Sequence, residues 1–149
     1  MANKTGSPIT KKIILIVGLP GSGKTELARK MGGALLDDLS NNGGLEKIDV
    51  LVNTNEPLII ITDPHLCRTE AREFAIRFLS EHASEYIVEW IFFENNIEAC
   101  RDNIQNRRVF GDLRIVETTL ERLAKAYVVP DFGRVVPVWR ACSCNYNKD

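Results

Sequence analysis

Residues 18–25 read Gly-Leu-Pro-Gly-Ser-Gly-Lys-Thr, and this octapeptide constrains the fold more than any other part of the chain. It matches the pattern G-x-x-x-x-G-K-[ST] in full. The apolar run at residues 13–17 directly precedes it, which predicts a buried strand, then a glycine-rich turn, then a helix that begins near Lys24. Backbone N–H groups in such a turn and at the helix start bind anions, so we expect polyphosphate here.

The side chains of this octapeptide have distinct expected roles. Lys24 is expected to neutralise the β- and γ-phosphates of ATP, and the Thr25 hydroxyl to ligate the accompanying Mg²⁺. The residues expected to bind the nucleotide are Leu19, Pro20, Gly21, Ser22, Gly23, Lys24 and Thr25, of which Leu19 and Pro20 only shape the loop. The alternative is an ordinary glycine-rich turn, against which the flanking strand and helix patterns argue.

Length and composition indicate one globular domain. The chain has 149 residues, of which 44% are hydrophobic and 26% charged, enough for one core. We therefore expect one domain over residues 1–149, with polar tails at 1–10 and 142–149. Nineteen basic and twenty acidic residues give a net charge of −1, so no bulk field attracts nucleic acid or membrane, although a local basic patch is possible.

The cellular location is predicted from what the sequence lacks. No apolar stretch approaches the roughly 18 residues that span a bilayer, and no signal-peptide core is present. The cysteines do not have the spacing of zinc or thioredoxin-like motifs, so we interpret all four as reduced thiols: Cys67, Cys100, Cys142 and Cys144. These features favour a soluble, cytoplasmic protein.

Strand-like and helix-like segments alternate along the whole chain. Further strands are predicted at 34–36, 58–62, 86–93 and 135–139, and helices at 26–31, 45–52, 69–80, 97–107 and 115–127, with a loop at 109–114. This alternation predicts a three-layer α/β/α domain with a mainly parallel five-stranded sheet. Ligands of such sheets bind at the carboxyl ends of the strands.

Acidic residues follow two of the predicted strands. Asp37 and Asp38 end the strand after the phosphate loop, where one carboxylate could accept a proton from an attacking hydroxyl, and we favour Asp37. The alternative for this pair is helix capping or solvation. Asp63 follows the strand at 58–62, in the pattern of an acid that holds Mg²⁺ directly or through water, although a turn before Pro64 explains it equally well.

A basic cluster flanks the predicted loop at residues 109–112. Planar arginine donors on a closing segment can stabilise the charge of a transferring phosphoryl group, so this region is expected to form a short helical lid. The alternative is a solvated basic helix end. Its members are Arg101, Arg107, Arg108 and Arg114, and Arg107 is favoured as the catalytic residue that also contacts the donor.

With these features, the chain resembles the small P-loop kinases of the adenylate-kinase-like group, and most closely the 5′-kinase domain of phage polynucleotide kinase. The resemblance lies in segments that occur in the same order: 13–25, 35–38, 58–63, 89–103 and 107–127. It implies that Asp37 is the general base, with Asp38 as the alternative. It also implies that Arg107, with Arg108 as the alternative, binds the donor phosphates.

The expected activity is transfer of the γ-phosphoryl group of ATP to a hydroxyl. The resemblance implies the 5′-hydroxyl of a polynucleotide as the acceptor, whereas the near-neutral net charge favours a nucleoside, a nucleotide or another small metabolite. A nucleotide-dependent regulatory ATPase or binder is a further alternative, and an inactive scaffold that merely retains the loop is another. The sequence offers little for the regulatory ATPase, since it has neither a guanine-reading Asn-Lys-x-Asp segment nor an obvious water-orienting Gln.

Overall fold

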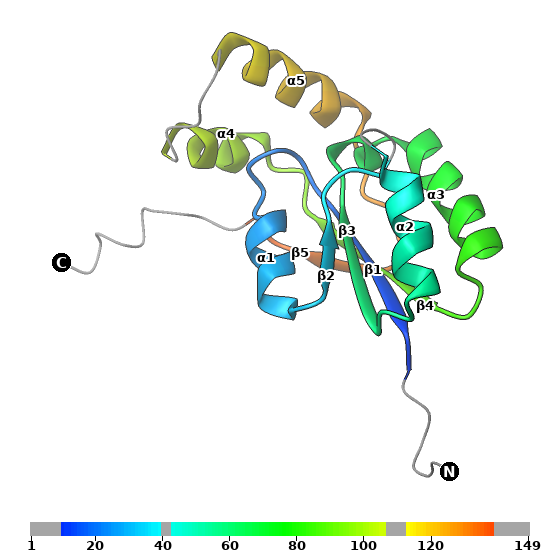
Figure 1. Cartoon of the computed structure of the whole chain (residues 1–149). Coiled ribbons are helices and arrows are strands. Elements are labelled where there is room, and N and C mark those ends of the chain that lie inside the picture. Colours follow the sequence, from blue (N-terminus) through cyan, green and yellow to red (C-terminus); the bar gives the residue numbers. More distant parts are fainter. Residues whose placement is uncertain (1–9, 40–42, 107–112, 139–149) are drawn as a thin grey trace, which may run out of the picture.

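The centre of the computed structural model, which describes residues 10–39, 43–106 and 113–138, is a five-stranded sheet (Figure 1). The strands lie in the order β2-β3-β1-β4-β5, and each pairing between neighbours is parallel. Their bounds are β1 (Lys12–Val17), β2 (Ala34–Leu36), β3 (Leu58–Thr62), β4 (Ile87–Phe93) and β5 (Arg134–Val136). The carboxyl ends of the strands therefore meet at one edge of the sheet.

Strand β1 occupies the middle of the sheet because its side chains are apolar on both faces. From Ile13 to Val17 each residue is buried, and β3 and β4 flank the strand on either side. A strand covered on both faces has no alternation of polar and apolar residues, and the run of isoleucine, leucine and valine reflects this. The phosphate loop thus begins from the most buried strand of the domain.

Helices form the outer layers. They are α1 (Lys24–Met31), α2 (Gly44–Asn53), α3 (Thr69–His82), α4 (Ile97–Asn106) and α5 (Leu113–Ala126), with a short 3₁₀ turn, η2 (Pro64–Cys67). Figure 1 shows α1 on one side of the sheet and α2 and α3 on the other. The pair α4 and α5 lies above the carboxyl ends of the strands, beside the turn that follows β1. This end of the sheet is where the candidate site lies.

The strand order explains why a crevice forms at this edge. From β1 the chain moves outward to β2, returns to β3, and then crosses over β1 to β4 and β5. The connection after β1 and the connection after its neighbour β3 thus run in opposite directions across the sheet, and such a reversal opens a crevice at the carboxyl ends of the strands. The loop after β1 and the segments after β2, β3 and β4 border this crevice.

The predicted three-layer α/β architecture is confirmed, with differences at boundaries. The sheet is parallel throughout the described strands, rather than mainly parallel. The loop predicted at 109–114 is wrong at its end, because α5 already begins at Leu113. Ile115, in the first turn of α5, is 65% exposed, so this apolar residue does not mark a buried stripe at the start of the helix. The last strand covers Arg134–Val136, and Trp139 lies outside the described residues.

Candidate phosphate-transfer site

The loop between β1 and α1 has the backbone conformation of an anion-binding turn. Gly21 and Gly23 have φ angles of 84° and 108°, a region that glycine enters without a Cβ clash. Gly23 is the N-cap of α1 and has no side-chain cap, so the first N–H groups of the helix lack a side-chain partner in the described chain. Glycine geometry and an uncapped helix start together fit a phosphate group.

The side chains of the loop are preorganised around this turn. The Lys24 ammonium donates to the carbonyl oxygens of Gly18 and Leu19, at 2.9 and 3.0 Å, which folds its charge back over the loop. The Ser22 hydroxyl is fully buried and has no hydrogen-bond partner within the described structure. Thr25 is exposed at the helix start. The predicted donor-binding residues 19–25 thus form the turn and the first two residues of α1, and their chemistry suits a polyphosphate with its Mg²⁺.

Asp37 is held at the same edge of the sheet by a neighbouring strand. Its Oδ1 accepts a hydrogen bond from the Thr62 hydroxyl at 2.9 Å, and Thr62 is only 3% exposed. Thr62 is the last residue of β3 and is in register with Ile16 of β1, one residue before the end of that strand. A carboxylate that follows β2 is therefore anchored next to the strand that carries the phosphate loop.

Asp38 lies beside Asp37 in the chain but is not held by Thr62. It is partly buried, and it takes part in other interactions. The structure thus gives the two candidate bases different surroundings. The anchored carboxylate is that of Asp37, which the sequence reasoning favoured, and its role as the base stays a prediction.

Asp63 is a buried carboxylate with several protein partners. It is 2% exposed, its Oδ2 accepts from the Leu39 N–H at 3.0 Å, and its Oδ1 accepts from the His65 N–H at 2.9 Å. The His65 Nδ1 lies 3.1 Å from the same Oδ1. Asp63 therefore caps η2 and fixes the segment after β2, which is the conformational role that competed with metal binding. Contact with Mg²⁺ through water stays a prediction.

No group of three or more His, Cys, Asp or Glu side chains with a metal-binding arrangement occurs in the described part of the chain. The magnesium ion of a polyphosphate site usually keeps several waters and phosphate oxygens as ligands. One hydroxyl and one or two carboxylates suffice for it. Thr25 and Asp63, the two predicted metal ligands, are of the required chemical type.

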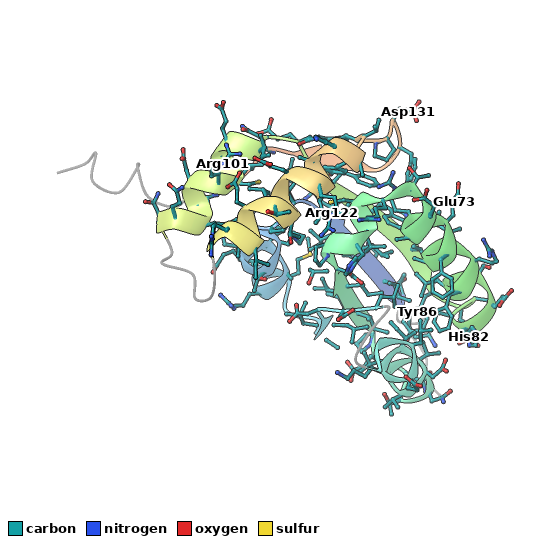
Figure 2. The ribbon with its side chains drawn as sticks, turned by 90° about the horizontal axis from the view of Figure 1, so that it is seen from above. Glu73, His82, Tyr86, Arg101, Arg122 and Asp131 are labelled. Carbon is teal, nitrogen blue, oxygen red and sulfur yellow. The ribbon has the colours of Figure 1, made fainter. Side chains whose placement is uncertain are left out.

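The predicted lid arginines are only partly described. Arg107 and Arg108 lie outside the described residues. Arg101 is in view on α4 next to α5 (Figure 2), where its Nε and Nη2 donate to the Glu117 carboxylate at 2.6–3.0 Å. This hydrogen bond raises the pKa of Arg101 and lowers that of Glu117. Arg101 thus joins α4 to α5 instead of standing ready for a phosphate.

Asn103 is a site residue that the sequence analysis missed. It is 5% exposed, and its Nδ2 donates to the carbonyl oxygen of Gly21 in the phosphate loop, at 2.9 Å. The sequence held one signal for it: Ala99, Cys100, Asn103 and Ile104 form the buried stripe of α4. An asparagine on the apolar face of a helix needs a polar partner, and the phosphate loop supplies one.

A hollow of about 380 Å³ lies beside the Asp63 carboxylate, between the segment after β2 and the start of α3. We name it the β3–α3 hollow, and its described lining residues are Leu39, Asp63, Leu66, Glu70, Ala71 and Phe74. The lining is mostly apolar, Phe74 is 42% exposed, and the charged lining residues are both acidic. The hollow thus suits a compact molecule with an apolar face better than an anion.

Two thiols lie beneath the site. Cys67 and Cys100 are free and fully buried. Burial raises the pKa of Cys67 to about 12 and that of Cys100 to about 11, and the positive charge of Lys24 acts in the opposite direction on both. The two side chains are therefore protonated packing groups, in agreement with the expected reduced thiols. Cys142 and Cys144 lie outside the described residues.

None of the described helices combines the length with the apolar character that a membrane span requires.

Comparison with known proteins places this geometry in a class. No protein-family model matches the chain. The fold is similar to that of a gluconokinase from Sinorhizobium meliloti, with a TM-score of 0.55 and 14% identity, over 90% of this chain and 86% of that one. It is also similar to that of a sugar kinase from Janibacter, with a TM-score of 0.52 and 16% identity, over 86% of both chains.

The parallel sheet, the phosphate loop at its crevice and these neighbours define an α/β protein with the P-loop kinase fold. Its sequence is 31% identical over 122 residues to "Uncharacterized protein R277" of Acanthamoeba polyphaga mimivirus. The match covers 75% of this chain and 86% of the viral protein, so the chain belongs to the same family as that protein.

Proposed function

We propose that the protein is an ATP-dependent kinase that transfers the γ-phosphoryl group to a hydroxyl of its acceptor. The observation that carries the proposal is the carboxylate of Asp37, anchored by Thr62 at the strand edge that also bears the phosphate loop. A switch or motor ATPase needs a group that orients water. A kinase needs a carboxylate where an acceptor hydroxyl can meet the phosphate, and we assign this role to Asp37.

Each residue has a defined role in the proposed reaction. The hydroxyl oxygen of the acceptor bonds to the γ-phosphorus as the bond to the β,γ-bridging oxygen breaks, and the hydroxyl proton passes to the Asp37 carboxylate. Lys24 and the amides of the loop carry the charge of the donor phosphates, and Arg107, with Arg108 as the alternative, takes up charge on the transferred group. Thr25 would hold Mg²⁺, which screens the phosphates when bound.

For the acceptor, the chemistry of the β3–α3 hollow favours a small molecule. Asp63 and Glu70 line it, and no basic side chain does so among the described residues. A protein that binds a polynucleotide gains much of its affinity from lysine and arginine side chains that neutralise the phosphates. Two solved kinases of similar fold are named for gluconate and for a sugar, which are small hydroxyl-bearing molecules.

A polynucleotide 5′-hydroxyl is the second candidate, from the resemblance of the segment order to phage polynucleotide kinase. One observation favours it: Phe74, at the hollow, begins a row of stacked rings along α3. Its ring centroid is 6.2 Å from that of Phe78, which is 4.1 Å from that of His82. Aromatic rows of this kind stack bases of single-stranded nucleic acids.

The test follows labelled γ-phosphate from ATP in the presence of Mg²⁺. The acceptors come in matched pairs: glucose and gluconate, a nucleoside and its 3′-monophosphate, and 5′-hydroxyl DNA and RNA oligonucleotides. Transfer to any of them, abolished in Lys24→Ala and reduced at least a hundredfold in Asp37→Asn, is the expected result.

The pattern across the panel then separates the candidates. If the β3–α3 hollow binds a small acceptor, monomers are labelled, and its acidic lining favours the uncharged member of each monomer pair. A polynucleotide kinase labels oligonucleotides, with an activity that falls steeply as salt rises. A third outcome is that ATP releases free phosphate and no acceptor is labelled. If Asp37→Asn leaves this release unchanged, the result would contradict the kinase proposal and favour a regulatory ATPase.

A further inference from the structure

The carbonyl of Gly21 in the phosphate loop is held from outside the loop. Its partner is the Asn103 amide on α4, at 2.9 Å, and the two residues are separated by 82 positions in the sequence. Asn103 is 5% exposed, so water competes little for this bond. A buried amide that bonds to a loop carbonyl constrains the orientation of that carbonyl.

The same peptide unit is also held at its other polar group. The N–H of Ser22 donates to the carbonyl oxygen of Leu19, at 3.0 Å. The peptide between Gly21 and Ser22 therefore has both its C=O and its N–H engaged, each by a different partner. Gly21 has a φ of 84°, in a region that glycine enters without steric strain. Without these two hydrogen bonds, the peptide could therefore rotate at low cost.

Helix α4 is a firm support for this contact. A Cβ built on Gly21 would lie 2.6 Å from the Cys100 carbonyl oxygen and 2.8 Å from Ile104 Cγ1, so the loop backbone touches the helix directly. Asn96 caps the start of α4 by accepting from the Ala99 N–H at 3.1 Å. The Arg101–Glu117 pair then fixes α4 to α5.

We propose that Asn103 is a positioning residue of the phosphate loop, which holds the Gly21 carbonyl towards α4 and thereby away from the bound phosphates. Rotation of this peptide would turn a carbonyl oxygen towards a polyanion, which repels it. The Asn103 amide prevents that rotation before the nucleotide arrives. The inference rests on nucleotide binding by the loop, as in the proposed function, but not on phosphoryl transfer.

The test compares nucleotide affinity with thermal stability in purified full-length variants. Asn103→Asp is isosteric, but it replaces the donor with an acceptor that faces the Gly21 carbonyl. We expect its Kd for a fluorescent ATP analogue with Mg²⁺ to rise at least tenfold, and that of Asn103→Ala to rise less. The matched control is Asn95→Ala, which removes an amide that donates to the Ala124 and Tyr127 carbonyls, at 3.0 and 2.9 Å, away from the loop.

A positioning role and a structural role give different results. The control is expected to lower Tm with the Kd unchanged within twofold. If the Asn103 variants likewise lose Tm but keep the wild-type Kd, the proposal is wrong.

A second measurement uses the native protein and needs no variant to fold. The side-chain amide protons of Asn103 are expected to exchange slowly with water and to change NMR frequency when the ATP analogue binds. An amide that exchanges freely, or that does not respond although the analogue binds, would overturn the proposal. A protein that binds the analogue but labels no acceptor would refute only the kinase assignment.

Discussion

The hydroxyl of Thr62 donates a 2.9 Å hydrogen bond to Oδ1 of Asp37, and so fixes the proposed base to the end of β3. Thr62 is 3% exposed, whereas Asp37 is exposed to solvent. A surface carboxylate without such a bond would populate other rotamers for much of the time. The bond from the buried threonine orients the Asp37 carboxylate at the carboxyl end of β3.

Replacement of Thr62 by valine is expected to lower kcat about tenfold, because the shape is kept while the bond that orients Asp37 is lost. The Kd for ATP should not change, since the Thr62 hydroxyl donates to Asp37 and not to the phosphate loop. Steady-state kinetics with the acceptor found in the panel, together with nucleotide titration, measure both quantities. Asp38→Asn is the comparison, expected to keep kcat within threefold. A larger loss in Asp38→Asn than in Asp37→Asn would reverse the assignment of the base.

Asp63→Asn is expected to destabilise the protein by about 2 kcal/mol, because a buried carboxylate that accepts backbone bonds from Leu39 and His65 loses charge and one acceptor. Urea unfolding without nucleotide and Mg²⁺ measures this directly. If the unfolding free energy is instead unchanged and the Mg²⁺ concentration for half-maximal activity rises, the main role of Asp63 is in the metal site.

Gly21→Ala and Gly32→Ala form a matched pair of substitutions at left-handed glycines. At Gly32, with φ of 78°, an added Cβ meets nothing within 4 Å, so the cost is the backbone strain of about 1 kcal/mol. At Gly21 the Cβ also collides with the backbone of α4, 2.6 Å from the Cys100 carbonyl oxygen. We expect Gly21→Ala to lose more stability and to bind nucleotide weakly. Equal Tm values for the two variants would contradict the close approach of α4.

Arg107→Ala and Arg108→Ala are both expected to lower kcat. The larger effect, about a hundredfold, is expected for Arg107→Ala, because we assign to Arg107 the stabilisation of charge on the transferred group. Arg101→Ala is the control from the same cluster. Its guanidinium is engaged by Glu117 at 2.6 Å, so its loss should leave kcat within threefold. A greater loss of kcat in Arg101→Ala than in Arg107→Ala would mean that the wrong arginine has been assigned.

Stability is expected to fall as pH rises above about 8.5. An unfolded thiol ionises near that value, whereas the pKa of Cys67 is about 12 and that of Cys100 about 11 in the folded chain. Between these limits the folded state binds more protons than the unfolded state, so alkali favours unfolding. Urea midpoints from pH 8 to 11 measure the slope. The variant with both Cys67→Ala and Cys100→Ala should show a shallower decline, and an identical slope would exclude the thiols as its cause.

The local elements of this protein could be predicted because their causes are local. A run of apolar residues before the glycines specifies a strand buried on both faces, and Gly21 and Gly23 have the positive φ angles that a phosphate loop requires. The order of strands and helices followed from alternating patterns in the same way. These features depend on residues within a turn or two of each other.

The partners of the site residues could not be predicted in this way. The sequence placed Asp63 and Asp37 at strand ends, but not the bonds that Leu39 and Thr62 make to them. It grouped Arg101 with the lid arginines, whereas the structure pairs it with Glu117. Residue type and periodicity specify which face of an element is buried, and they do not specify which distant group completes a hydrogen bond.

The sequence by itself therefore determined the phosphate loop, because eight consecutive residues contain all the backbone freedom and charge that it needs. Only the tertiary structure decided how that loop is supported and what faces it. The Asn103 amide reaches Gly21 across 82 positions, and the Thr62 hydroxyl reaches Asp37 across 25. Contacts of this range exist only after the sheet has brought its strand ends to one edge, since that arrangement depends on the packing of the whole core.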